Sequence, residues 1–212
     1  MFTGIVQDLV TVQRIEHHGD ISRLSLDLGG MTDGLQTGAS VAVNGVCLTV
    51  THVGQGSADF DIVAETLRMT NLGRLQAQDQ VNVERSFAVG AEVGGHIVSG
   101  HVSGTAELVE RRVQGHDHVV VLATPADWFK YIFLKGFVAL DGASLTVSDV
   151  WREEGRFAIS LIPETLQRTT LGFVDEGSFI NVEVDSQTVT TVDTVERLMA
   201  DPQWREQIGL AS

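Results

Sequence analysis

The sequence contains little from which a disulfide, a zinc site or a membrane span could be built. Its 212 residues include a single cysteine, Cys47, so no disulfide can form within the chain and a cysteine-based zinc site is excluded. No apolar run approaches the ~20 residues that cross a bilayer. The first residues lack the basic and apolar regions of a signal peptide. We therefore expect a cytoplasmic protein without a membrane partner.

Positive charge is also scarce. Fourteen Lys and Arg residues stand against 28 Asp and Glu residues, which gives a formal net charge of −14 and a pI near 4.7. A sequence-independent grip on nucleic acid needs a basic surface, so we expect no nucleic-acid partner. Glycine, in contrast, is abundant at 22 residues, and the tight turns that it allows are typical of β-rich folds.

The two halves of the sequence repeat each other. Four blocks of the first half recur in the same order in the second, at offsets that drift from 96 to 99 residues. This drift requires only one or two insertions, which we expect in loops. The matching blocks are 3–6 with 99–102, 44–50 with 141–147, 65–67 with 164–166, and 81–84 with 180–183.

Each repeat has the pattern of a β-domain. Short β-branched segments bounded by Gly, Asp or Asn, such as 40–43 and 47–53, predict strands joined by tight turns. Residues 65–72 and 164–171 look helical. We therefore predict an all-β fold with short helices, in which two tandem small barrels arise by internal duplication. The expected domains are 1–93 and 94–188, with a junction in the glycine-rich stretch 88–95.

The remaining residues, 189–212, are predicted to form a C-terminal oligomerisation helix and tail. Val192, Val195, Leu198 and Met199 recur at the spacing of one helix face. This helix lies outside both repeats, so its apolar stripe needs a partner. Two interpretations remain open: the stripe packs on its own barrel, or it associates subunits.

The repeated motif places small polar groups on one face of a strand. Residues two apart share a face, so Cys47 and Thr49 point one way while Leu48 points to the core. Ser144 and Thr146 do the same in the second repeat. Small hydroxyl and thiol groups on a barrel wall suit hydrogen bonding to the edge of a flat heterocycle. Threonine is also simply a good strand former, but the recurrence of the whole block favours a binding role.

The mismatches between the repeats indicate that the two sites have diverged. Ile5 of the first repeat corresponds to His101, and Cys47 corresponds to Ser144. The first repeat thus has a thiol without an imidazole, and the second has both an imidazole and a hydroxyl. An enzyme that treats two similar molecules as donor and acceptor would show this pattern.

Other functional classes fit less well. His96 and His101 would face opposite sides of a strand and make a poor metal chelate, so no metal site is expected. The stretch 142–146 lacks the second glycine of a hydrolase nucleophile elbow. Lys135 is one of two lysines and precedes the second motif. A solvated lysine and a site residue are equally plausible there.

These motifs resemble those of the riboflavin synthase family over residues 1 to about 199. They are Met-Phe-Thr-Gly-Ile-Val at 1–6, Asn-Gly-Val-Cys-Leu-Thr-Val at 44–50, Gly-Gly-His-Ile-Val-Ser-Gly-His-Val at 94–102, Asp-Gly-Ala-Ser-Leu-Thr-Val at 141–147 and Ile-Pro-Glu-Thr-Leu at 162–166. The resemblance implies two six-stranded Greek-key barrels and a homotrimer held by the C-terminal helices. Association with lumazine synthase is a further partner that it suggests.

The resemblance also implies a transferase that works without a cofactor or a metal. Its reaction would be the last step of riboflavin biosynthesis. Two molecules of 6,7-dimethyl-8-ribityllumazine exchange a four-carbon unit, which gives riboflavin and 5-amino-6-ribitylamino-pyrimidinedione. The alternative is a non-catalytic lumazine- or flavin-binding homologue. Such relatives are altered at the second-repeat positions where this chain keeps His101, Ser144 and Thr146, so the enzyme is favoured.

In such enzymes the site lies between the first barrel of one subunit and the second barrel of a neighbour. Carried over to this sequence, one lumazine would be lined by Gly4, Ile5, Val6, Cys47, Leu48, Thr49, Ile62, Val63, Ala64, Glu65, Thr66, Gly100, His101 and Val102. The other would be lined by Lys135, Ser144, Leu145, Thr146, Leu161, Ile162, Pro163, Glu164 and Thr165.

Four of the residues named here are candidates for the chemistry. The C7 methyl of the acceptor ring is acidic, and His101 is the expected base because of its intrinsic pKa. Ser144, Cys47 or a held water would add to C7 of the donor, and the sequence does not choose between them. Phe2 is expected to help close the pocket. The stretch 90–92 and the tail beyond residue 200 depart from the family pattern without touching these motifs.

Overall fold

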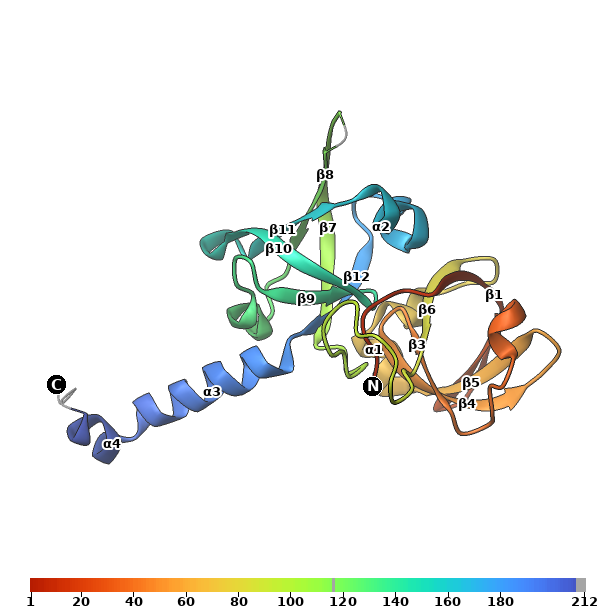
Figure 1. Ribbon diagram of the computed structural model, residues 1–212, viewed down its shortest axis with the longest axis horizontal. Coiled ribbons are helices and arrows are strands. Elements are labelled where there is room, and N and C mark those ends of the chain that lie inside the picture. The colour runs from red at the N-terminus through yellow and green to blue at the C-terminus, as the bar shows by residue number, and fades with distance from the viewer. Residues whose placement is uncertain (116, 209–212) are drawn as a thin grey trace.

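Alternating apolar residues close the chain into two β-barrels. The computed structural model describes residues 1–115 and 117–208, and in it two closed antiparallel six-stranded barrels lie beside each other, with a helix leaving the second (Figure 1). The predicted fold class is confirmed. Across the described ranges, no helix combines the length and apolarity needed to span a membrane.

The two barrels share one strand order. In the first, the order is β1-β2-β5-β4-β3-β6, and adding six to each number reproduces the neighbours of the second. Strands β3, β4 and β5 form consecutive hairpins and β2 returns beside β5, which is a Greek key. The strands are β1 (Asp8–His18), β2 (Ile21–Asp27), β3 (Ser40–Val43), β4 (Val46–Val53), β5 (Ser57–Val63), β6 (Gln80–Arg85), β7 (Gly104–Gln114), β8 (Asp117–Ala123), β9 (Phe137–Leu140), β10 (Ala143–Trp151), β11 (Arg156–Leu161) and β12 (Phe179–Val184).

A short helix and a 3₁₀ turn follow the fifth strand of each barrel. Helix α1 (Ala64–Met69) with the 3₁₀ turn η2 (Asn71–Arg74) occupies the first helical segment predicted from the sequence. Helix α2 (Pro163–Arg168) with η5 (Thr170–Gly172) occupies the second. Three further 3₁₀ turns are η1 (Gly29–Thr32), η3 (Asp127–Tyr131) and η4 (Arg152–Glu154).

Each barrel has its own apolar core. Fully buried side chains fill the interiors, for example Leu24 and Phe60 in the first barrel and Leu108 and Phe157 in the second. These side chains alternate with outward-facing residues along their strands, as half-buried strands require. The linker 86–103 joins the two barrels, and the predicted boundary at residues 93/94 lies within it.

Helix α3 (Ser186–Ala200) leaves the second barrel and is followed by α4 (Pro202–Gln207) (Figure 1). Lys130 contacts Glu196 at 2.6 Å and holds the helix near η3. The apolar stripe nevertheless stays open, because Val195 is 53% and Met199 40% exposed. The interpretation that the stripe packs on its own barrel is therefore wrong for these two residues. Residues 209–212 of the predicted tail lie outside the described residues.

Candidate functional site

Two short segments cross between the barrels. Strap 1 (residues 3–6) precedes the first barrel but lies on the second, where the Gly4 carbonyl accepts a hydrogen bond from the Ser144 backbone N–H at 2.7 Å. Strap 2 (residues 99–102) precedes the second barrel but lies on the first, where the Gly100 carbonyl accepts from the Cys47 N–H at 2.9 Å. The chain thus exchanges the entry segments of its two repeats.

The straps approach the opposite barrels so closely that only glycine fits. Gly4 and Gly100 have φ of +72° and +84°, in the left-handed region. A Cβ on Gly4 would lie 2.5 Å from Cβ of Ser144, and one on Gly100 would lie 2.4 Å from Cβ of Cys47. Both conformation and space exclude a side chain at these positions.

Each strap is anchored by a buried carboxylate. Glu84 on β6 accepts hydrogen bonds from the N–H and hydroxyl of Thr3 at 2.6 and 2.8 Å, and from the Gly4 N–H at 3.0 Å. Glu183 on β12 accepts the equivalent three bonds from strap 2. Burial raises the pKa of Glu84, and the donors of Thr3 and Gly4 act against that rise because they favour the ionised form.

Under each strap the surface is hollowed. We call the hollow of about 240 Å³ in the first barrel the Cys47 pocket, and that of about 260 Å³ in the second barrel the Ser144 pocket. The Cys47 pocket is lined by Val46, Cys47, Glu65, Thr66, Met69, Thr70, Gly100, His101 and Val102. The Ser144 pocket is lined by Gly4, Ile5, Val6, Ala143, Ser144, Leu145, Ile162, Glu164, Thr165, Arg168 and Thr169.

The two linings consist largely of residues that are equivalent in the repeat, yet three positions differ in chemistry. Cys47 is replaced by Ser144, His101 by Ile5, and Met69 by Arg168, which pairs with Glu164. Because the straps are exchanged, Cys47 and His101 line one pocket, while Ser144 and Ile5 line the other. His101 and Ser144 belong to the same repeat, yet His101 lines the pocket of Cys47, which is where the lining sets implied by the family resemblance placed it.

One segment of the predicted lining sets needs a correction. Gly4, Ile5 and Val6 were expected beside Cys47, but they line the Ser144 pocket. The alignment of the repeats shows which positions are equivalent. It does not show that the entry segments change places, because that depends on contacts between residues far apart in the chain.

Several predicted residues stand behind or beside the linings. The side chains of Leu48, Ile62 and Leu161 are at most 5% exposed and belong to the barrel cores. These residues can therefore contact a ligand only through their backbone atoms. Thr49, Val63, Ala64, Thr146 and Pro163 are exposed next to the pockets. Lys135 is exposed in the turn before β9, with a positive φ of 63°, and is absent from both linings.

Phe2 does not line either pocket. Its side chain is fully buried in a small core with Ala42, Val98 and Ala139, against which Cys47 packs. Its backbone forms a β-bridge with Val98 that joins the residues just before the two straps. Phe2 was expected to help close the pocket. In the structure it instead supports the wall behind Cys47.

The sequence did not identify His96, which contacts Ser144 although it is not among the residues that line the Ser144 pocket. Its Nδ1 lies 2.7 Å from Oγ of Ser144, and its ring stacks on Phe137 with centroids 5.2 Å apart. Burial lowers the pKa of His96, although the Asp185 carboxylate acts against this, so the neutral ring is favoured. A neutral imidazole can accept the serine proton. No spacing rule reveals this contact, because the partners are 48 residues apart.

His96 and His101 also test the argument about a metal site. They lie outside regular strands, so the reason given from strand alternation does not apply. They are nevertheless separate, since His96 contacts Ser144 while His101 lines the Cys47 pocket.

A second polar region lies where the two hairpin turns meet. The turns Asn44-Gly45 and Asp141-Gly142 both have positive φ at their two residues, as type I′ hairpins require. A Cβ on Gly45 would lie 2.6 Å from the Gly142 nitrogen, so the turns touch. The chain reaches Cys47 and Ser144 within three residues of these turns. The turn contact therefore fixes both pockets to each other.

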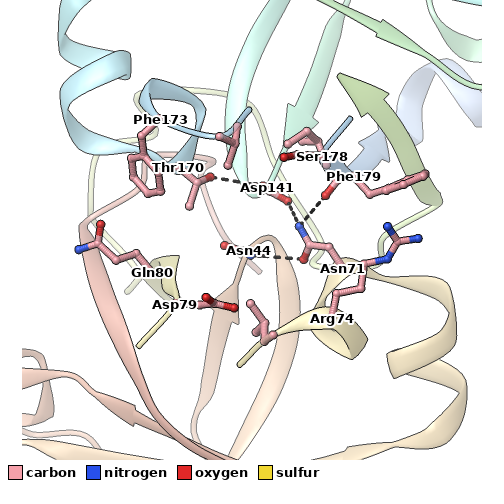
Figure 2. A pocket seen from close by; sticks show the side chains of 13 residues that line it. Asn44, Asn71, Arg74, Asp79, Gln80, Asp141, Thr170, Phe173, Ser178 and Phe179 are labelled. Atoms are coloured by element: carbon pink, nitrogen blue, oxygen red, sulfur yellow. Dashed lines mark hydrogen bonds between the residues drawn. The ribbon is translucent and has the colours of Figure 1, made fainter. Parts of the chain in front are cut away.

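The carboxyl group of Asp141 lies at the centre of this contact. This fully buried group accepts hydrogen bonds from the Asn71 amide and the Thr170 hydroxyl at 2.9 and 3.3 Å (Figure 2). It also accepts one from the Asn181 N–H at 2.8 Å. Burial raises the pKa of Asp141 to about 7. A cavity of about 350 Å³ with a mixed polar and apolar lining adjoins it, with Arg74 on its wall. No predicted site residue is among the described residues that line this cavity.

The comparisons with known proteins agree with this geometry. The model of the lumazine binding domain matches residues 3–86 and again 99–185. Riboflavin synthase of Escherichia coli (strain K12) is 46% identical over 202 residues, which are 94% of each chain. Riboflavin synthase of Mycobacterium tuberculosis (strain ATCC 25618 / H37Rv) is 44% identical over 94% of this chain and 98% of that protein.

Solved structures show the same fold. LumP complexed with 6,7-dimethyl-8-(1'-D-ribityl) lumazine has a TM-score of 0.79 and 23% identity, and it covers 88% of this chain and 100% of its own. LumP complexed with riboflavin has a TM-score of 0.80 at 24% identity, with the same coverage. At this identity the likeness concerns the fold alone.

Proposed function

The chain belongs to the riboflavin synthase family, and from this premise we propose that it converts two molecules of 6,7-dimethyl-8-ribityllumazine into riboflavin and 5-amino-6-ribitylamino-pyrimidinedione. It is an enzyme of the transferase type, and the group transferred would be a four-carbon unit. The observation that carries the proposal is the pair of equivalent pockets that differ at Cys47/Ser144 and His101/Ile5. Two copies of one substrate would then meet two different environments.

We assign the base to the Cys47 pocket. A lumazine held there would place its acidic C7 methyl near His101, which takes the proton as general base. The resulting carbanion attacks the second lumazine to form the new carbon–carbon bond. Cys47 lines the same pocket and supplies a weakly polar wall beside the ring.

We assign the nucleophile to the Ser144 pocket. The short contact between Ser144 and His96 supports Ser144 over Cys47, because the neutral imidazole can accept the hydroxyl proton as the oxygen adds to C7 of the donor. Cys47 has no equivalent contact with an imidazole among the hydrogen bonds of the described residues. Holding the two rings in one productive pose could contribute up to ~7–11 kcal/mol to catalysis.

The two pockets need a neighbour to face each other, and we propose a homotrimer in which the Cys47 pocket of one subunit meets the Ser144 pocket of the next. The open apolar stripe of α3, which includes Val195 and Met199, supports subunit association. Association with lumazine synthase, which would deliver the substrate, remains a prediction that co-purification tests. The cytoplasmic location also remains a prediction, which cell fractionation tests.

The function is tested with purified protein and 6,7-dimethyl-8-ribityllumazine as the only added compound. We expect the absorbance of riboflavin to develop without added nucleotide or metal. The competing function is a lumazine- or flavin-binding protein, and it has the support of the fold shared with LumP. Tight binding of the lumazine without riboflavin formation would favour that function over catalysis.

A further inference from the structure

Two buried carboxylates outside both linings determine where the straps lie. Glu84 and Glu183 are 4% and 7% exposed, and each accepts three hydrogen bonds from the first two residues of a strap. In these bonds both carboxyl oxygens of each glutamate serve as acceptors. A side chain with two adjacent acceptor oxygens therefore matches the strap backbone in a way that few other side chains could.

The pocket that each carboxylate supports is not the pocket of its own barrel. Glu84 belongs to the first barrel, but strap 1 passes from it to the second barrel, where Gly4 binds Ser144. Glu183 belongs to the second barrel, but strap 2 passes to the first barrel, where Gly100 binds Cys47. In each case one glycine connects the two contacts: its N–H reaches the carboxylate and its carbonyl reaches the opposite barrel.

We propose that Glu84 and Glu183 are crossed positioning residues, so that Glu84 sets the geometry of the Ser144 pocket and Glu183 that of the Cys47 pocket. The proposal deepens the proposed function and rests on it only for the identity of the ligand. It assigns no contact with the substrate to either carboxylate. Its content is that a change in one barrel alters the site in the other.

Exchange of either glutamate for glutamine isolates this effect. The amide keeps the size of the side chain but replaces one acceptor oxygen with an NH₂ group. That group must then face a backbone N–H of the strap, either in Thr3 or Gly4 for Glu84→Gln, or in Ser99 or Gly100 for Glu183→Gln. Loss of a hydrogen bond to a charged group, with the donor left facing another donor, loosens the strap at its anchor.

The first readout is the alkylation of Cys47, the only cysteine in the chain, by iodoacetamide, followed by mass spectrometry of the full-length protein. Strap 2 lies directly against this residue, since a Cβ on Gly100 would overlap it. We expect Glu183→Gln to accelerate alkylation about ten-fold or more, and Glu84→Gln to change it much less. The latter variant is the matched control, because it alters the same chemistry in the barrel that holds Cys47.

The second readout moves the cysteine from the first barrel to the second. In a Cys47→Ser/Ser144→Cys background the reporter lies under strap 1 instead. There Glu84→Gln should accelerate alkylation and Glu183→Gln should become the control. A crossed pattern in both backgrounds supports the proposal. Equal acceleration by both variants, a larger effect within the same barrel, or no effect in either background overturns it.

Milder variants keep the test valid where a glutamine variant fails to fold. Thr3→Val and Ser99→Ala each remove one hydroxyl bond to Glu84 or Glu183 and leave the backbone bonds in place. They should show the same crossed direction with smaller accelerations. Alkylation requires no substrate, so a failure of this proposal is distinguishable from a failure of the proposed function.

Discussion

The chemistry at the scale of single residues depends on where the repeat has diverged. His101 and Ile5 occupy equivalent positions, but the exchanged straps bring the imidazole to Cys47 and leave the isoleucine beside Ser144. The site therefore has one imidazole for each polar group, His101 near the thiol and His96 against the hydroxyl. This division is consistent with a base in one pocket and a nucleophile in the other.

Replacement of His101 tests its role as the base. We expect His101→Ala to lower kcat by about 100-fold or more, because loss of a general base typically costs 10²–10⁴-fold, while lumazine affinity changes little. Steady-state rates give kcat, and equilibrium fluorescence titration gives the affinity for lumazine. Equal losses in turnover and in affinity would show that His101 binds the ring and does not remove its proton.

Replacement of Gly100 tests the close approach of strap 2. Gly100→Ala should destabilise the protein more than Gly19→Ala, and urea unfolding measures both. Gly19 has a similar positive φ of 64° but no atom within 4 Å of the added Cβ, so it reports only the backbone cost of about 1 kcal/mol. Gly100→Ala adds the clash with Cys47. Equal destabilisation in the two variants would mean that strap 2 moves away from Cys47 without a loss of folding free energy.

Prediction from the sequence succeeded where neighbours along the chain determine the outcome. Strand alternation placed Cys47 and Thr49 on one face and Leu48 in the core, and Leu48 is indeed buried. Prediction failed for His96 and for the grouping of strap 1, because both depend on contacts between segments about 50 to 140 residues apart. The alternation of apolar and polar residues along a strand also cannot show whether a side chain such as Ile62 lies in the barrel core or lines a pocket.

At the scale of elements, the paired hairpin turns hold the two barrels together. Asn44 and Asp141 are equivalent residues, yet one is an amide and the other a carboxyl group. The reason lies in Asn71, whose amide NH₂ faces Asp141 and whose carbonyl oxygen accepts from Asn44 and Asn181. One side of the contact therefore accommodates a carboxylate and the other an amide.

Titration of Asp141 should make stability depend on pH. Its pKa is raised from 3.8 to about 7, so the folded state retains a proton that the unfolded chain has lost. The free energy of unfolding therefore falls as pH rises from about 4 to about 7, by up to ~1.4 kcal/mol per pH unit. Asp141→Asn removes this contribution, and urea unfolding at several pH values measures the difference between the two proteins.

The equivalent turn supplies the contrast for that measurement. Asn44→Asp would place a carboxylate oxygen against the carbonyl oxygen of Asn71, and we expect it to destabilise the protein at neutral pH. If wild type and Asp141→Asn show parallel pH profiles between pH 4 and 7, the proton on Asp141 is not linked to folding.

At the scale of the whole molecule, the proposed function predicts that more than one chain is needed. Each chain has two different pockets, and α3 extends away from the second barrel (Figure 1) with Val195 and Met199 exposed. A helix with such an open stripe is typical of an association surface. The same element would thus determine both assembly and activity.

Charges on the stripe of α3 should dissociate the assembly. We expect Val195→Glu/Met199→Glu to yield monomers with intact barrels and little turnover, because each active site would lack its second pocket. Arg197→Glu on the opposite helix face is the control and should keep the assembly. Sedimentation velocity and circular dichroism measure mass and fold. Full activity in a monomeric variant would show that one chain completes the site by itself.

The stoichiometry of the reaction tests the central claim, which is that two diverged pockets process two copies of one substrate. Purified protein is incubated with 6,7-dimethyl-8-ribityllumazine alone, and chromatography follows substrate, riboflavin and the pyrimidine together. The account predicts that two lumazines disappear for each riboflavin formed, with one pyrimidine released. Consumption of one lumazine per riboflavin, or binding without any product, would contradict it.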